Sequence, residues 1–388
     1  MTPRAAYVHI PFCEHICYYC DFNKVFLKNQ PVAEYLDALE REIELTLQQY
    51  PTDRLETIFI GGGTPTALNE DQMQRLMDII KKHLLPLTDE TLEYTVESNP
   101  DGVSPEKLDI MKAGGVNRVS FGVQSFDDGL LERIGRTHRE AKVAETLEHA
   151  AKRFDNISVD LMFGLPNQTL EQVRYDVERA LRLPITHISS YSLILEPHTV
   201  FAIQERKGKL PLPTQDLEAD MYRLMIETIE AGGLHQYEIS NFSLPGRESR
   251  HNRVYWENDE YYGFGAGSHS YINKTRRANI APIPHYIKAE GLPVRNETPL
   301  TEVERMEEEM FLGLRMKEGV SEQHFEAKYG YSLDQVFGQT IAKLLPRGLV
   351  ERTATHIRLT DAGVPLANEV FAEFIGEAEI EEQKTDQV

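Results

Sequence analysis

The sequence predicts an α/β fold, namely a partial (β/α)6 barrel of the TIM type followed by a smaller, mostly helical, winged-helix-like C-terminal domain. Six strand-like runs in the first half of the chain are each followed by a loop and an amphipathic helical segment. Strands that alternate with helices in this way form parallel sheets. After about residue 301, helical segments lead into two short strands joined by a turn, in GLVERTATHIRLTDAG, which is typical of a winged helix. A short doubly wound sheet is the alternative that the pattern leaves open for the first part.

The six strands are predicted from short runs of β-branched and aromatic residues. They are AAYVHIPF, LETIFIG, LEYTVES, NRVSFGVQS, ISVDLMFG and HISSYSLIL. After the first strand, Val32, Leu36, Leu39 and Ile43 recur at intervals of three and four and predict a helix with one apolar face. A second helix is predicted over 70–84 by the same spacing after the start Asn-Glu-Asp, which suits a helix N-terminus.

The regular alternation ends near residue 200. A helix is predicted over 214–232, then a strand in HQYEISNF, a loop-rich aromatic segment HNRVYWENDEYYGFGAGSHSYI and a proline-punctuated linker APIPHYIKAEGLPVRNETPL. We therefore expect a barrel over 1–235, an accessory strand and loop segment over 236–300, and the C-terminal domain over 301–388. The acidic last residues EAEIEEQKTDQV are predicted to form a frayed tail.

Composition excludes several classes of protein. The chain of 388 residues has 41 Lys+Arg and 62 Asp+Glu, a net charge of −21, which repels nucleic acid and anionic lipid. Residues 301–388 carry 9 basic and 18 acidic residues, which argues against the DNA binding common among winged helices. The sequence shows neither an apolar run long enough to span a membrane nor a secretory signal. We expect a cytoplasmic protein that reaches a membrane, if at all, through a partner.

All three cysteines of the chain, Cys13, Cys17 and Cys20, fall in CEHICYYC directly after the first strand. An odd number of thiols cannot close a full set of disulfides, so the cluster favours metal ligation. A zinc site, with His15 as the fourth ligand, is one alternative. Three thiolates can instead hold three irons of a 4Fe-4S cubane and leave the fourth iron open to an external chelating ligand.

GGGTPT, over 61–66, ends the second predicted strand. A triple glycine lets the backbone approach a ligand closely, although a tight turn into a helix is the simpler interpretation. Polar residues stand at or near the ends of later strands, and they are Glu97, Gln124, Arg136 and Asp160. Each alone is more often a cap or a surface residue, but the carboxyl ends of parallel strands meet at one mouth. Carboxylates there suit ribose hydroxyls or an ammonium group, and arginine suits a carboxylate.

With these motifs in place, the sequence resembles the radical S-adenosylmethionine (SAM) superfamily, whose signature is this cysteine spacing. The resemblance implies that the open iron binds SAM and that an electron from the cluster cleaves SAM to a 5′-deoxyadenosyl radical. In that superfamily the matching glycines contact the amino group of SAM, a role that carries over to Gly62, Gly63 and Thr64.

Within the superfamily, the chain resembles oxygen-independent coproporphyrinogen III oxidase and its relatives, the HemW-type haem chaperones. The likeness runs through YVHIPFCEHICYYCDF, GGGTPT, ESNP, GVQSF and VDLMFGLP into the C-terminal module. It implies that Tyr7 and Tyr19 flank SAM and that the four polar strand-end residues complete the SAM pocket.

Two features favour the chaperone branch. The oxidase pattern has a further cysteine where this chain has Phe22, and it has an N-terminal extension before the first strand. The chaperone branch carries an HNxxYW motif associated with haem, which matches HNRVYW at 251–256. The resemblance implies that His251 is an axial haem ligand or shapes the haem pocket, while Tyr255 and Trp256 offer flat apolar surface. His269 in the nearby GFGAGSHS is expected to belong to a structural turn.

The resemblance therefore implies a haem chaperone that carries a 4Fe-4S cluster and SAM and delivers haem to acceptor proteins. A protein that donates electrons or haem is a further expected partner. The alternative is an enzyme, the oxygen-independent coproporphyrinogen III oxidase, which removes carbon dioxide from propionate side chains by radical chemistry.

Overall fold

The structure is a computed structural model that describes residues 2–378. Most of the predicted acidic tail lies outside the described residues. The chain forms two compact units, and both are discontinuous in sequence. The first comprises Met1–Gln236, Ser240–His251 and Glu260–Glu297, and the second comprises Tyr237–Ile239, Asn252–Asp259 and Thr298–Val388. The segment over 236–300 therefore contributes residues to both units.

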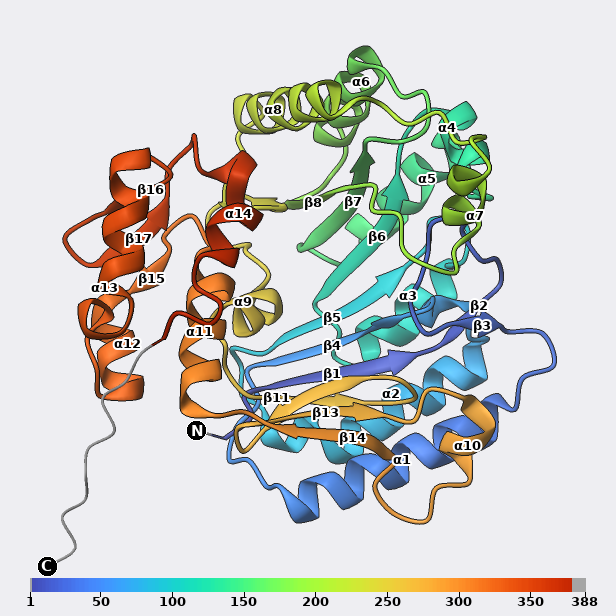
Figure 1. The fold of residues 1–388 in the computed structure, drawn as a ribbon. Coiled ribbons are helices and arrows are strands. Elements are labelled where there is room, and N and C mark those ends of the chain that lie inside the picture. The colour runs from blue at the N-terminus through green and yellow to red at the C-terminus, as the bar shows by residue number, and fades with distance from the viewer. Residues whose placement is uncertain (1, 379–388) are drawn as a thin grey trace, which may run out of the picture. The chain divides into compact units, whose positions relative to one another are not determined.

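Six parallel strands form the centre of the first unit, and they confirm the predicted partial barrel (Figure 1). In their hydrogen-bonded order they are β1 (Ala5–Ile10), β4 (Thr57–Gly62), β5 (Glu93–Ser98), β6 (Arg118–Gln124), β7 (Ile157–Phe163) and β8 (His187–Ser192). Two very short strands, β2 (Phe12–Cys13) and β3 (Val25–Phe26), pair in parallel beyond the end of β1. All six β-branched and aromatic runs are thus strands, and their carboxyl ends share one side of the sheet.

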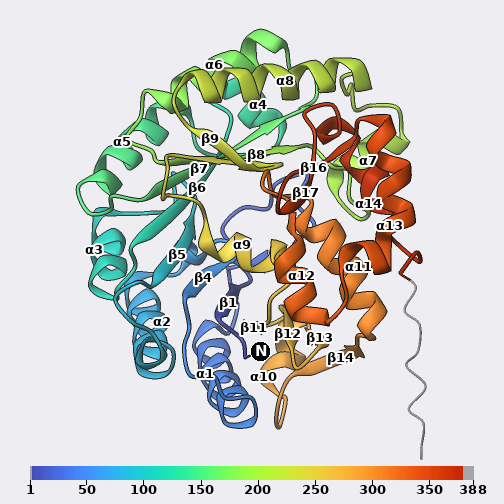
Figure 2. The same cartoon turned by 90° about the vertical axis from the view of Figure 1, so that its left-hand side faces the viewer.

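Helices cover the outside of the curved sheet (Figure 2). They are α1 (Val32–Gln49), α2 (Glu70–His83), α3 (Pro105–Ala113), α5 (Glu140–Ala151), α6 (Leu170–Leu181) and α8 (Gln215–Ala231). Two shorter helices, α4 (Asp128–Arg133) and α7 (Val200–Arg206), belong to a separate apolar cluster with Tyr18 and Tyr19. The apolar face predicted for α1 is buried, including Leu36, Leu39 and Ile43. Asn69 and Gln72 form a capping box at the start of α2, as its N-terminal sequence suggested.

The sheet extends beyond the six predicted strands on both sides, to twelve strands. Beside β8 lie β10 (Asn241–Ser243) and β9 (His235–Glu238), and beside β1 lie β11 (Tyr261–Phe264), β12 (His269–Ile272), β13 (Thr275–Asn279) and β14 (Val294–Pro299). Two short helices, α9 (Arg250–Trp256) and α10 (Ile283–Ile287), lie in the same part of the chain. The strand predicted in HQYEISNF thus corresponds to β9 and β10, and further strands and two short helices stand where the sequence suggested loops and a linker. The aromatic residues Tyr262 and Phe264 are buried, because β11 pairs with β1 and covers its edge.

The second unit has its own hydrophobic core and confirms the winged-helix-like prediction. Its elements are α11 (Glu302–Gly313), β15 (Val320–Ser321), α12 (Glu322–Tyr329), α13 (Leu333–Leu344), β16 (Val350–Arg352), β17 (His356–Leu359) and α14 (Ala367–Ala372). The three strands form an antiparallel sheet in the order β15-β17-β16. Met310, Phe325 and Phe337 lie at the centre of the apolar core. Of the helices within residues 2–378, none combines the length and apolar character needed to cross a membrane.

Candidate functional site

The loop that carries the three cysteines begins directly after β1. Cys13 is buried at the end of β2, whereas Cys17 and Cys20 are partly exposed. Backbone hydrogen bonds fix the middle of the loop, because Tyr18 N donates to the Ile134 carbonyl at 3.1 Å and Phe201 N donates to the Tyr18 carbonyl at 3.0 Å. The loop is thus held in place by residues of the barrel that are far away in sequence.

The glycine turn after β4 is attached to the same strand segment as Cys13. Gly63 N donates to the Ile10 carbonyl at 2.9 Å, and Thr64 N donates to the Phe12 carbonyl at 2.8 Å. A Cβ on Gly63 would lie 2.8 Å from the Phe12 carbonyl oxygen, so only glycine fits there. Gly62 has a φ of 110°, which disfavours any L side chain. The turn is therefore more than a generic loop, because its close approach to the Cys13 strand requires glycine.

Thr64 connects the glycine turn to Cys13. Its Oγ1 donates to Cys13 Sγ at 3.7 Å. Burial raises the pKa of the Cys13 thiol to about 11, while the Thr64 hydrogen bond and the positive charge of Arg136 act in the opposite direction. In residues 2–378, no three His, Cys, Asp or Glu side chains gather closely enough to enclose one metal ion. A cubane cluster binds each cysteine through a different iron, so it does not require three sulfurs around one point.

A chain of hydrogen bonds leads from Thr64 to the cysteine loop. Asn99 Nδ2 donates to Thr64 Oγ1 at 3.1 Å, and Arg136 Nη1 donates to Asn99 Oδ1 at 2.7 Å. Arg136 Nη2 donates to the Tyr19 hydroxyl at 3.0 Å. The structure therefore brings together three of the residues selected from the sequence. Asn99 was missed, although its position in ESNP, directly after β5, marked it as a strand-end residue.

Gln124 lies beside Arg136 at the end of β6. A Cβ on Gly122 would lie 3.1 Å from both Arg136 Nη2 and Gln124 Nε2. Gln124 has a φ of 68°, and the pairing of β6 with β7 shifts register between Gly122 and Gln124. Such a bulge redirects a side chain near a strand end. It accounts for the position of the Gln124 amide, which lies close to Gly122 on the same side as the Arg136 guanidinium.

Glu97 and Asp160 place two carboxyl groups inside the barrel. Gly62 N donates to Glu97 Oε2 at 3.0 Å, and Ser120 Oγ donates to Asp160 Oδ1 at 3.2 Å. Burial, reinforced by the negative charge of Asp160, raises the pKa of Glu97 to about 7. Burial also raises the pKa of Asp160. Both side chains are half-buried, so neither carboxyl group is completely covered by protein atoms.

Arg118 is a charged residue of the barrel interior that was not among the residues predicted from the sequence. Its side chain is fully buried on the first residue of β6, and its Nε has no hydrogen-bond partner among the described residues. Its positive charge lowers the pKa of both Glu97 and Asp160 and so offsets part of the effect of their burial.

The HNRVYW segment lies at α9, and the structure separates its residues between the two units. His251 is fully buried in the first unit, where its Nδ1 lies 2.8 Å from Thr57 Oγ1. Burial, together with the positive charge of Arg118, lowers the pKa of His251 to about 3. Thr57 is the first residue of β4, whereas the cysteine loop follows the carboxyl end of β1. His251 and the cysteines therefore lie at opposite ends of the parallel strands.

Tyr255 and Trp256 belong to the second unit and are half-buried. The Arg315 guanidinium lies over the Trp256 ring, with 4.3 Å between its central carbon and the ring centroid. Trp256 Nε1 is buried and has no hydrogen-bond partner among residues 2–378. His269 is exposed at the start of β12, directly after the turn formed by Gly265 to Ser268.

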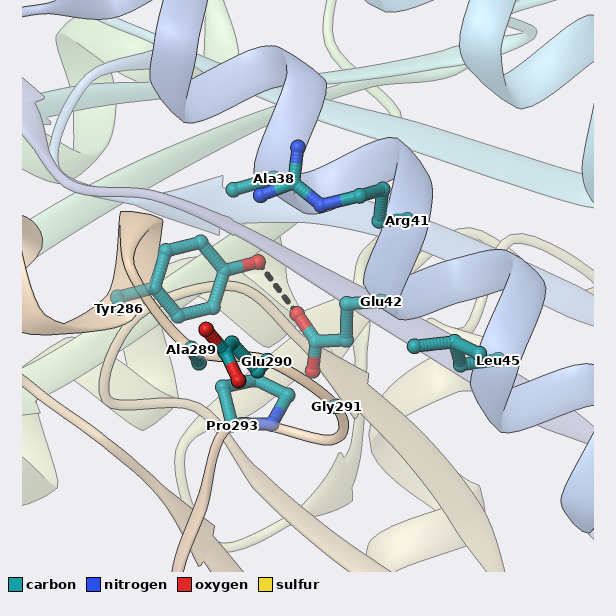
Figure 3. A pocket seen from close by; sticks show the side chains of 9 residues that line it. All are labelled: Ala38, Arg41, Glu42, Leu45, Tyr286, Ala289, Glu290, Gly291 and Pro293. Carbon is teal, nitrogen blue, oxygen red and sulfur yellow. Dashed lines mark hydrogen bonds between the residues drawn. The ribbon is translucent and has the colours of Figure 1, made fainter.

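A cavity of about 260 Å³ opens between α1 and α10 (Figure 3). The buried Glu42 carboxylate forms part of its wall and accepts hydrogen bonds from the Tyr286 hydroxyl, from Gly265 N and from Asn279 Nδ2. None of the residues selected from the sequence lines this cavity. The Glu42 contacts join α1 to the strands that extend the sheet beside β1.

Comparison with known proteins gives the chain its family. Residues 7–180 match the model described as the radical SAM superfamily, and residues 300–366 match the HemN C-terminal domain. The chain is 52% identical to the "Heme chaperone HemW" of Bacillus subtilis, over 96% of this chain and 100% of that protein. It is 45% identical to the protein of the same name from Lactococcus lactis, over 96% and 97% of the two chains.

A solved structure shows the same fold. The coproporphyrinogen III oxidase HemN from Escherichia coli, described as a radical SAM enzyme, matches with a TM-score of 0.84 and 25% sequence identity. The match covers 96% of this chain and 90% of that chain. Together with the relatives of 52% and 45% identity, it shows that this chain belongs to the HemW family of radical SAM proteins.

Proposed function

We propose that this protein is a haem chaperone that binds haem, transfers it to acceptor proteins and carries a 4Fe-4S cluster to which SAM binds. The observation that carries the proposal is the 52% identity, over 96% of this chain, to a protein named "Heme chaperone HemW". Membership of the radical SAM superfamily implies SAM and a 4Fe-4S cluster. The cytoplasm is the proposed compartment, and a protein that donates electrons or haem is a proposed partner.

Cys13, Cys17 and Cys20 are the proposed cluster ligands. The donor set fits, because they are the three cysteines of the chain and lie in one loop that distant parts of the barrel hold in place. A bound cluster supplies one-electron reduction next to the mouth of the barrel. The hydrogen bond from Thr64 to Cys13 Sγ favours the thiolate form that a metal site requires.

The proposed SAM site consists of nine residues, which are Tyr7, Tyr19, Gly62, Gly63, Thr64, Glu97, Gln124, Arg136 and Asp160. Hydrogen bonds already connect several of them, in one chain from Tyr19 through Arg136 and Asn99 to Thr64 and in a second contact from Gly62 to Glu97. Arg136 suits the carboxylate of SAM, and the Glu97 and Asp160 carboxylates suit ribose hydroxyls or the ammonium group.

Haem contact is proposed for His251, Tyr255 and Trp256. The half-buried rings of Tyr255 and Trp256 offer flat apolar surface, and Arg315 beside Trp256 supplies a positive charge that suits a propionate. His251 is fully buried, so contact of its imidazole with haem iron requires the first turn of α9 to move. The alternative role for His251, which needs no movement, is to shape the segment that carries the two rings.

The second candidate function is that of an oxygen-independent coproporphyrinogen III oxidase. The TM-score of 0.84 to the enzyme HemN favours it. Phe22 argues for the chaperone, because it stands where the oxidase pattern has a cysteine, and its side chain is 61% exposed.

One experiment separates the two functions. The cluster is reconstituted without oxygen, and the protein is supplied with SAM, an electron donor and coproporphyrinogen III, while haem is titrated into a second sample. The chaperone proposal expects saturable haem binding and no protoporphyrinogen IX. Product formation above controls without stable haem binding would refute it. A Cys17→Ala variant that keeps the full iron-sulfur absorbance would refute the ligand assignment.

A further inference from the structure

Four aromatic rings form a continuous column from His251 to the end of β1. The His251 and Phe59 rings are stacked, with 5.0 Å between centroids and 26° between planes. Phe59 stacks on Tyr7 at 6.1 Å and 27°, and Tyr7 lies 5.9 Å from His9. Tyr7 and Phe59 are direct neighbours in the pairing of β1 with β4, so the strand register itself brings their rings together.

The column is held at both ends by hydrogen bonds. At the His251 end, His251 Nδ1 lies 2.8 Å from Thr57 Oγ1, and His251 N donates a hydrogen bond to the Glu93 carboxylate at 3.0 Å. At the other end of the column, the Tyr7 hydroxyl lies 2.9 Å from His9 Nδ1. The His251 ring therefore cannot rotate away from Phe59 without breaking its bond to Thr57.

His9 joins the column to the cysteine loop. Its Nε2 lies 2.7 Å from the carbonyl oxygen of Asn23, a residue three positions after Cys20. The Asn23 side chain is also held, because its Nδ2 donates to the Ala266 carbonyl at 2.7 Å and to the Ala281 carbonyl at 3.2 Å. Both the backbone carbonyl and the side-chain amide of Asn23 therefore have fixed partners. The segment that leaves the last cysteine is thus positioned by His9 and by the turn after β11.

We propose that His251 is a positioning residue for the cofactor site, which supports the Phe59 ring and thereby sets Tyr7, His9 and the loop segment after Cys20. This inference rests on the proposed SAM and cluster site. The HNRVYW segment would then have a second role, because His251, its first residue, would support the proposed SAM residue Tyr7 from the opposite end of the strands.

The chemistry of an imidazole suits this role. Its ring is flat, so it stacks on Phe59, and its Nδ1 still reaches the Thr57 hydroxyl. Phenylalanine would keep the stack and lose the hydrogen bond, whereas alanine would leave a cavity under Phe59. Packed interiors transmit such a defect, because neighbouring side chains relax only partly into the space.

The first turn of α9 joins the aromatic column to the proposed haem residues. A ligand that displaces the first turn of α9 would also disturb the column, so haem and SAM would change each other's affinity. Linkage requires that both affinities change by the same factor. The proposal therefore predicts an energetic coupling between two sites at opposite ends of the strands.

The test compares His251→Ala with His187→Ala in the full-length, cluster-reconstituted protein. His187 is a matched control, because it is also fully buried in the barrel and its Nδ1 lies 2.8 Å from Ser158 Oγ, but it is not one of the four rings of the column. The readouts are SAM affinity by equilibrium dialysis and the change that SAM causes in the electron paramagnetic resonance spectrum of the reduced cluster. The thermal midpoint of each variant reports general destabilisation.

We expect His251→Ala to weaken SAM binding by roughly ten- to hundredfold, the scale of the loss when a residue that orients the direct ligands of a site is removed. The spectral response to SAM falls with it, while His187→Ala keeps both properties, and His251→Phe restores most of the affinity. If His251→Ala does not fold, Phe59→Leu interrupts the same column one ring nearer to Tyr7 and should give the same loss.

The inference is overturned if His251→Ala keeps the wild-type affinity and spectral response, or if His187→Ala loses them equally. Haem titration of the same samples separates the two proposals. A His251→Ala protein that loses only haem binding would support a ligand role and refute the positioning role. A wild-type protein that does not bind haem would refute the chaperone function and leave the SAM measurements valid.

Discussion

Substitution of Gly63 by alanine is expected to damage the protein at the point where the glycine turn meets the cysteine strand. The new Cβ would lie 2.8 Å from the Phe12 carbonyl oxygen and 2.9 Å from both the Ile10 carbonyl oxygen and Phe12 N. All three are backbone atoms, so no side-chain rotation relieves the contacts. Ordinary van der Waals contact of a Cβ begins at 3.4 Å, so a backbone segment would have to move by roughly 0.6 Å.

Overpacking of this kind costs about 1–3 kcal/mol. That range lowers the folding equilibrium constant by a factor of roughly 5 to 160, at 1.36 kcal/mol for each factor of ten. Because the atoms that move belong to the residue before Cys13 and to the end of β1, cluster binding should weaken together with stability. The assay is urea unfolding of the protein without cluster, combined with the iron content after reconstitution.

Gly102→Ala is the matched control, because a Cβ on Gly102 meets nothing closer than 3.6 Å. It should unfold close to the wild-type urea concentration and bind the normal amount of iron. The reasoning fails if Gly63→Ala unfolds at the same urea concentration as Gly102→Ala and retains the same iron content.

Three further predictions concern buried charges. The pKa of Glu97 is about 7, so wild-type SAM affinity should rise between pH 6 and 8 as this carboxyl ionises, by at most about tenfold per pH unit. The affinity of Glu97→Gln for SAM should depend less on pH. Equal pH profiles of the two proteins in equilibrium dialysis would contradict this prediction. Burial raises the pKa of Glu42 to about 7, above its unfolded value, so its stabilising contribution is complete below pH 4 and is lost as pH rises through 7. Urea unfolding should therefore show a decline between pH 4 and 7, of at most about 1.4 kcal/mol per pH unit, that is shallower in Glu42→Gln. Lys328→Met should lower the free energy of unfolding by about 3–5 kcal/mol, because it removes the ammonium group that lies 2.7 Å from the buried Glu309 carboxylate. Lys142→Met, at an exposed ion pair with Glu145, should lower it by less than about 0.5 kcal/mol. Similar losses in both variants, measured by urea unfolding, would refute the argument.

The parallel strands were predictable because their signal is local. Each is a short β-branched or aromatic run that is buried on both faces, followed by a helix with its own period. β11 was missed because its partner, β1, lies about 250 residues earlier, so no local pattern marks the pairing. The helix α10 was missed because Pro284 suggested a linker. Proline is well tolerated in the first turn of a helix, and Pro284 occupies that turn.

The proposed site was predictable to the extent that strand ends gather at one mouth. Arg136, Thr64 and Tyr19 do belong to one hydrogen-bond chain. Arg118 could not be selected, because an arginine at the start of a strand usually points to solvent, and only the closed barrel shows that this one is buried. The position of His251 depends on its contact with Thr57, 194 residues earlier, which no spacing reveals.

The position of β1 within the sheet also affects synthesis of the protein on the ribosome. β1 is made before the other strands of this sheet, and its neighbour on one side, β11, begins only at Tyr261. At about 5–20 residues per second, the ribosome needs roughly 10–50 s to reach that point. During this interval the first strand of the nascent barrel has an open edge, whose unpaired N–H and C=O groups can pair with another chain. Until Tyr261 to Phe264 have been added, the growing polypeptide is exposed to misassembly at the strand that precedes all three cysteines.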